Sequence, residues 1–174
     1  MRYRQISAHP EPGTVERLTI VPVLPDGTLG ALAGTGVGTG ALVDPAAGIS
    51  AADDGASPER APLTLIHGEV GAEEDWYSQA VARISAERAG FAVDRVELVA
   101  AEGLAGALHL IVWADGDLAP EAEEGSGPQR PAPLLGLAPD QLRLRVAADQ
   151  GIIPGGASPA WIVADVAAAI ANSR

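Results

Sequence analysis

The segment 68–91, GEVGAEEDWYSQAVARISAERAGF, constrains the fold of this chain more than any other. A glycine turn leads into a cluster of acidic residues, and a helix follows that ends at Gly90, a residue suited to the left-handed conformation that closes a helix. The helix carries an apolar stripe that we expect to face a core: Trp76, Ala80, Val81 and Ile84. A loop that delivers carboxylates to a helix start suits a magnesium and pyrophosphate site.

The opposite face of this helix also has a simpler interpretation. Arg83 and Glu87 lie four residues apart and can form an ion pair on the surface. Such a pair contributes less than about 1 kcal/mol to stability. Taken alone, the segment is an amphipathic helix with one exposed ion pair.

The same residues resemble the Nudix signature, G-x5-E-x7-R-E-U-x-E-E-x-G-U, where U is an apolar residue. The matching residues are Arg83, Glu87, Gly90 and Phe91. Counting back from Arg83 places Asp75 at the first Glu of the signature. The signature Gly then falls at Glu69, one residue beyond Gly68, and a one-residue shift in the loop would reconcile the two.

The resemblance implies an α/β fold, the Nudix α/β/α sandwich around a mixed β-sheet, with residues 1–174 as a single domain. The C-terminal order of a helix, an apolar Ile152-Ile153 tract and a last helix is most similar to the ADP-ribose pyrophosphatase branch. Members of the family use Mg²⁺ to cleave a nucleoside diphosphate linked to another moiety. A nucleoside diphosphate is therefore the expected ligand.

The resemblance also implies a set of site residues. The catalytic candidates are Glu87, Arg83 and Asp75, and the metal candidates are Glu87, Glu74 and Asp75. His67 and Gly68, in the turn before the loop, are the candidates for substrate binding.

Two positions of the signature have lost their carboxylates. Ile84 replaces the Glu after the Arg, and Arg88 replaces the last Glu. Ile84 supplies no ligand, and Arg88 places a permanent positive charge where a dication would bind. We therefore expect a divergent protein without standard metal-dependent catalysis, acting as a ligand-binding or protein-interaction domain, with a homodimer as its candidate assembly.

Two alternatives stay open. An active Mg²⁺-dependent hydrolase would need carboxylates from elsewhere in the chain, such as Glu97 or Glu102. An unrelated α/β interaction domain would make the match accidental.

Composition excludes several function classes. The formal net charge is −12, and the 11 basic residues are all arginines, which argues against nucleic-acid binding and anionic membranes. The chain has no cysteine, so thiolate chemistry and Cys-ligated zinc are excluded. No apolar run approaches the ~20 residues that span a bilayer, and we expect a cytoplasmic protein. The Ala, Gly and Arg content is typical of a GC-rich bacterial genome.

The remaining elements follow from local patterns. We expect strands at 18–24, 93–100 and 106–114, a turn at 25–27, and helices at 140–149 and 158–172. The last helix should present an apolar face made of Trp161, Val163, Val166 and Ile170. Loops are expected near 44–61 and 115–133.

Overall fold

The computed structural model describes residues 10–11, 13–33, 63–104, 107–119, 133–149 and 159–173. Its central strand is β1 (Val15–Val23), a run rich in β-branched residues. The predicted turn at 25–27 is confirmed: Gly27 has a φ of 83°, and the Leu24 N–H donates to the Thr28 carbonyl at 2.9 Å. The chain then returns as β2 (Leu29–Ala33).

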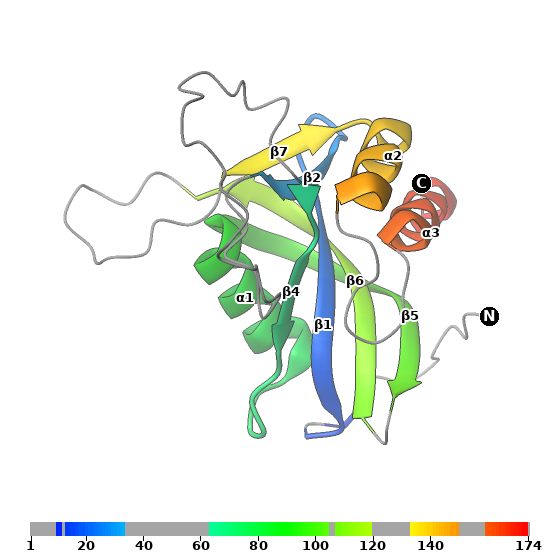
Figure 1. Ribbon diagram of the computed structural model, residues 1–174. Helices are drawn as coiled ribbons and strands as arrows, with labels where there is room; N and C mark the ends of the chain where they lie inside the picture. The colour runs from blue at the N-terminus through cyan, green and yellow to red at the C-terminus, as the bar shows by residue number, and fades with distance from the viewer. Residues whose placement is uncertain are drawn as a thin grey trace, which may run out of the picture.

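The described strands form one seven-stranded mixed sheet (Figure 1). Its order is β3 (Leu63–Thr64), β2, β1, β6 (Ala107–Leu118), β5 (Phe91–Leu104), with β4 (Ile66–Glu69) also paired to β1 and β7 (Leu134–Leu137) to β2. The pair β1–β6 is parallel, and every other pair is antiparallel. This register places Arg17 of β1 beside both Glu69 of β4 and His109 of β6.

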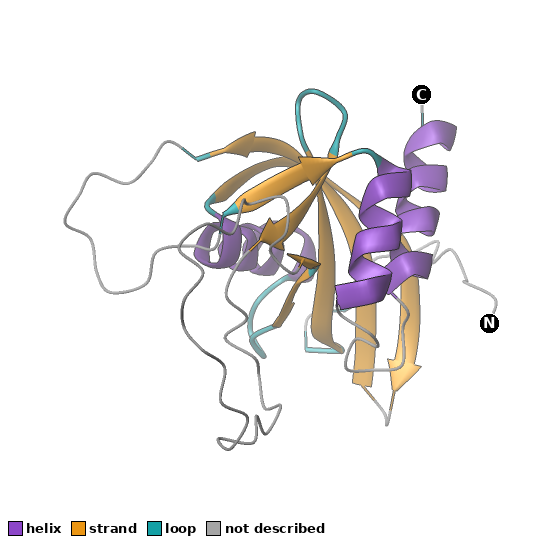
Figure 2. Ribbon diagram, turned by 45° about the horizontal axis from the view of Figure 1, so that its top comes forward, coloured by secondary structure: helices purple, strands orange, loops and turns teal. Residues whose placement is uncertain are grey.

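Helices cover both faces of the sheet: α1 (Val81–Ala89) on one side, α2 (Pro139–Asp149) and α3 (Pro159–Asn172) on the other. Successive side chains of a strand point to opposite faces. Leu18 and Ile20 of β1 accordingly belong to the core under α1, whereas Val21 and Val23 belong to the core under α2 and α3. Figure 2 shows the helices on opposite sides of the sheet. The predicted α/β sandwich around a mixed sheet is confirmed.

The helix predictions are confirmed with one exception. The α1 stripe is buried, and Gly90 closes the helix with φ 60° and ψ 30°. Helices α2 and α3 lie where the sequence predicts them. The prediction that Trp161 joins the buried face of α3 is wrong, because its side chain is 52% exposed and Ile162 is buried instead. Within the described residues, no helix has both the length and the apolar character needed to cross a bilayer.

The strands after α1 are longer than the sequence predicts. β5 begins at Phe91, and β6 continues through residues 115–118, where the sequence predicts a loop. Gly116 permits this continuation, because a Cβ there would overlap the Ala92 carbonyl oxygen. The rest of that predicted loop, residues 120–132, and the one at 44–61 lie outside the described residues.

Candidate functional site

The helix of the signature region begins with a π-helical turn, η2 (Trp76–Ala80), which runs directly into α1. The Ala80 N–H donates to the Asp75 carbonyl at 2.9 Å, a bond across five residues rather than four. Asp75 is the N-cap: its carboxylate accepts from the Ser78 N–H at 2.7 Å and the Gln79 N–H at 3.2 Å. Its pKa is lowered, chiefly by the hydrogen bond from the Ser78 hydroxyl. The Asp75 carboxylate therefore caps its own helix.

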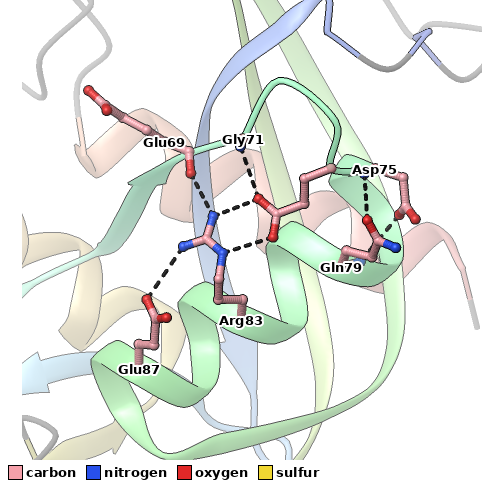
Figure 3. A network of polar contacts seen from close by, with 7 residues as sticks. Glu69, Gly71, Asp75, Gln79, Arg83 and Glu87 are labelled. Atoms are coloured by element: carbon pink, nitrogen blue, oxygen red, sulfur yellow. Dashed lines mark hydrogen bonds and ion pairs between the residues drawn. The ribbon is translucent and has the colours of Figure 1, made fainter.

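Arg83 is held by Glu74. Figure 3 shows Arg83 between the Glu69 backbone and Glu87. Its Nε and Nη2 donate to the two carboxylate oxygens of Glu74 at 2.8 and 2.7 Å, a bidentate geometry. Nη2 also donates to the Glu69 carbonyl at 2.9 Å, and Nη1 lies 3.4 Å from Glu87 Oε2. The hydrogen bond from Arg83 holds the pKa of Glu74 below its usual value, and Glu74 raises that of Arg83. The arginine thereby ties the loop to the helix.

This contact identifies Glu74, rather than Asp75, as the geometric partner of Arg83. Gly68 lies six residues before Glu74, which is the signature spacing of Gly to Glu. The one extra residue falls between Glu74 and Arg83, where the π-turn accommodates it. The one residue by which this chain differs from the signature spacing is therefore in the helix and not in the loop.

Gly68 packs directly against the helix. A Cβ at Gly68 would lie 2.9 Å from Ile84 Cδ1, closer than real Cβ contacts come. Ile84 is 2% exposed and belongs to the core under α1. A position that carries a glutamate in the signature is here part of the hydrophobic core.

Magnesium does not fit the side chains that the structure describes at this site. Glu74 is bound to Arg83, Asp75 caps the helix, and Glu87 is an exposed side chain that contacts Arg83. Among the described residues, no three His, Cys, Asp or Glu side chains come close enough together to hold a metal ion. Mg²⁺ requires several oxygen ligands in octahedral geometry.

A pocket of about 450 Å³ lies where α1 meets the edge of the sheet at β4. The lining residues are Arg17, Leu18, His67, Gly68, Glu69, Arg83, Ile84, Glu87, Arg88 and His109. The predicted residues His67, Gly68, Arg83 and Glu87 thus share one pocket, whereas Glu74 and Asp75 are not part of its wall.

Three arginines and two glutamates, Glu69 and Glu87, line the pocket. Arg83 is neutralised by Glu74, but neither Arg17 nor Arg88 forms an ion pair with any residue that the structure describes. Both lie at the surface of the pocket. Sequence patterns could not identify Arg17 as a site residue, since its position depends on the pairing of β1 with β4 and β6.

The chain is similar in fold to solved structures, one of which is described as a NUDIX hydrolase. The chain is similar to a structure described as an ADP compounds hydrolase, with a TM-score of 0.55 and 22% identity over 89% of this chain and 74% of that one. It is also similar to a NUDIX hydrolase from Nitrosomonas europaea, with a TM-score of 0.50 and 14% identity over 88% and 90% of the two chains. For the E. coli ORF135 protein the TM-score is 0.51, with 16% identity over 94% and 96%. No protein-family model and no curated protein matches the sequence.

Proposed function

We propose that this chain, which has the fold of the Nudix hydrolases, binds a phosphate-bearing ligand without magnesium and does not hydrolyse it. The main observation that supports the proposal is the set of α1 side chains that line the pocket. At two signature glutamate positions the pocket wall has the buried, apolar Ile84 and the cationic Arg88. The wall therefore favours an anion and offers little to a dication.

The arginines supply the expected binding energy. Guanidinium groups match the oxygens of phosphate in geometry and charge, and they form charge-assisted hydrogen bonds. A protein with a net charge of −12 repels polyphosphates unless local cations reverse the potential. Arg17 and Arg88, which lack carboxylate partners among the described residues, are the cations placed to do so.

A nucleoside diphosphate is the ligand class we infer. The pocket volume of about 450 Å³ lies within the usual range for small-molecule sites. One structure similar to this chain is described as an ADP compounds hydrolase, which makes ADP-ribose the first compound to try.

Calorimetric titration with ADP-ribose, with and without Mg²⁺, combined with an assay for the release of AMP and ribose 5-phosphate, tests the proposal. We expect equal affinity in both conditions and no turnover. Arg17→Gln and Arg88→Gln should each weaken binding about tenfold or more, because each removes hydrogen bonds between charged groups. Arg143→Gln, which changes an exposed arginine of α2 outside the pocket, is the matched control and should leave affinity unchanged.

An active Mg²⁺-dependent hydrolase is the alternative function. It is favoured by the retained contact of Glu74 with Arg83 beside Gly68, which preserves part of the signature geometry. Turnover that requires Mg²⁺ and falls in Glu87→Gln would establish this alternative and reject the proposal. Absence of ADP-ribose binding in a folded sample would instead favour a protein-interaction domain, and the homodimer would then be tested first, by sedimentation.

A further inference from the structure

Two histidines flank Arg17 on one face of the sheet at the pocket. His67 of β4 is the register partner of Thr19 of β1. Arg17, on the same strand as Thr19, is the register partner of His109 of β6. Alternate residues of a strand point to the same face, and so do register partners, so Arg17 shares its face with His67 and His109. All three line the pocket, and a phosphate at Arg17 therefore has an imidazole on each neighbouring strand.

The hydrogen bond of His67 determines which of its ring nitrogens carries a hydrogen. Nδ1 lies 3.2 Å from the Leu65 carbonyl oxygen. A carbonyl oxygen only accepts, so Nδ1 is the donor, and in the neutral ring the other nitrogen, Nε2, is then an acceptor. Nε2 has no hydrogen-bond partner among the residues that the structure describes, and it is the nitrogen available to a ligand in the pocket.

A neutral His67 does not suit a phosphate ligand. An ionised phosphate oxygen accepts hydrogen bonds, and Nε2 of the neutral ring also accepts, so the two atoms repel each other. A proton on Nε2 turns it into a charged donor, and a hydrogen bond between an imidazolium and a phosphate is strengthened by charge. Because an imidazole ordinarily takes up its proton near pH 6.5, little free energy is needed for this step at neutral pH.

We propose that His67 takes up a proton from solvent when the ligand phosphate binds, and then donates from Nε2 to a phosphate oxygen. The inference rests on the proposed function, because it concerns the same phosphate. Above the range in which a free imidazole titrates, the proton must bind together with the ligand. The affinity should then fall by up to about tenfold for each unit of pH increase.

The surroundings of His67 favour this proton once the ligand is present. The charged and titratable groups that line the pocket with it are Arg17 of β1, Glu69 of β4, Arg83, Glu87 and Arg88 of α1, and His109 of β6. Glu69 and Glu87 are exposed, so solvent screens their charges. A bound phosphate adds negative charge beside His67, and an opposite charge close by favours the protonated imidazole.

His109 is less suited to take up the proton. It is 3% exposed, and its Nε2 is hydrogen-bonded to Thr19 Oγ1 at 2.8 Å. Burial, together with Arg17 and His67, lowers the pKa of His109. His109 therefore stays neutral near pH 7, and His67 is the imidazole that responds to the ligand.

Calorimetry with ADP-ribose tests the inference. Both phosphates of ADP-ribose are diesters and keep their charge between pH 5.5 and 8, whereas a phosphomonoester titrates near pH 6. Titrations at pH 7 in two buffers that differ in ionisation enthalpy measure the protons taken up. We expect the wild type to take up protons on binding, with a Kd about tenfold larger at pH 8 than at pH 5.5. His67→Gln, whose amide donates without an added proton, should lose both effects.

His109→Gln is the matched control, because it removes the other imidazole of the pocket. It should still take up protons on binding, whatever its affinity. The ring-nitrogen chemical shifts of His67, measured by NMR in the wild type, give a readout that needs no variant. They should report the neutral ring with hydrogen on Nδ1 in the free protein at pH 8, and hydrogen on both nitrogens in the complex at pH 7.

Three results would overturn the inference and leave the proposed function standing. The first is binding of ADP-ribose with neither proton uptake nor dependence on pH. The second is proton uptake that persists in His67→Gln, which would assign the proton to another group. The third is a His67 ring that keeps a single hydrogen in the complex. If ADP-ribose binds at no pH, the proposed function fails and this inference fails with it.

Discussion

Glu74 and Arg83 lie nine residues apart, yet they form two parallel hydrogen bonds of 2.8 and 2.7 Å across the start of a helix. In the signature the same two positions are eight residues apart. The π-turn at residues 76–80 absorbs the difference, and α1 keeps the phase that points Arg83 toward Glu74. The effect of the one extra residue between Glu74 and Arg83 is thus confined to one turn.

Deletion of Tyr77 should therefore be tolerated. Tyr77 is exposed, and its removal would turn the π-turn into an α-helical one while Asp75 still caps the helix. We expect the free energy of unfolding, measured in urea, to change by less than about 2 kcal/mol. Deletion of Ala82 is the control, since it would rotate Arg83 away from Glu74 and should cost clearly more. Equal losses in the two variants would show that the π-turn is not a localised insertion.

Gly68 and Ile84 should be energetically coupled. Gly68→Ala would place a Cβ 2.9 Å from Ile84 Cδ1, an overpacking that costs about 1–3 kcal/mol. Ile84→Val alone should cost about 0.5–1.5 kcal/mol. In the double variant the smaller side chain makes room for the methyl group, and we expect its loss to be smaller than the sum of the two. A double-mutant cycle from urea unfolding measures this, and strict additivity would contradict the contact.

The sequence predicts the helix and its end better than it predicts the site. Gly90 is recognisable because few other residues tolerate a φ of 60°, and the stripe of α1 follows from helical spacing. Counting back from Arg83 selected Asp75, since a count along the chain assumes a regular helix. Arg17 and His109 meet in the pocket through a register between strands about 90 residues apart, which no local pattern encodes. The sequence wrongly predicts that Trp161 lies on the buried face of α3, because adjacent apolar residues in an alanine-rich helix fit more than one choice of buried face.

Glu102 should make the protein less stable as the pH rises. Its pKa is raised in the folded state above the ordinary value of 4.5, so the folded protein holds this proton more tightly than the unfolded chain. The resulting stabilisation is complete below pH 4.5 and is lost as the pH rises through the folded-state pKa. Urea unfolding between pH 4 and 8 should show the free energy of unfolding of the wild type falling relative to Glu102→Gln. A constant difference between the two would mean that Glu102 has the same pKa in the folded protein and in the unfolded chain.

Glu74 should show the opposite dependence on pH. Its pKa is lowered by Arg83, so its contribution is present above pH 4.5 and is lost as the pH falls through the folded-state pKa. Because the Arg83 side chain is 39% exposed, solvent screens the pair, and Glu74→Gln should cost about 1 kcal/mol or less at neutral pH. The wild type and the variant should converge on acidification. A loss that persists undiminished at pH 3 would assign the effect to packing.

Restoring a glutamate at each of the two signature positions should lower the free energy of unfolding by unequal amounts. Arg88 is exposed, so Arg88→Glu should change the free energy of unfolding by about 0.5 kcal/mol or less. Ile84 is 2% exposed, and Ile84→Glu would place a carboxylate in the core under α1 at a cost of about 3 kcal/mol or more. Ile84→Leu is the control, with an expected cost below about 1.5 kcal/mol.

The same variants test whether carboxylates at residues 84 and 88 can restore Mg²⁺-dependent turnover. Calorimetry should detect no Mg²⁺-dependent turnover in Arg88→Glu, because one added carboxylate beside Glu87 does not complete an octahedral set of ligands. A glutamate at residue 84 would destabilise the folded protein. This residue is a metal-ligand position in the signature, but here it belongs to the core and packs against Gly68. If Ile84→Glu retains the wild-type free energy of unfolding in urea, its carboxylate must reach the pocket. It would then be available as a metal ligand.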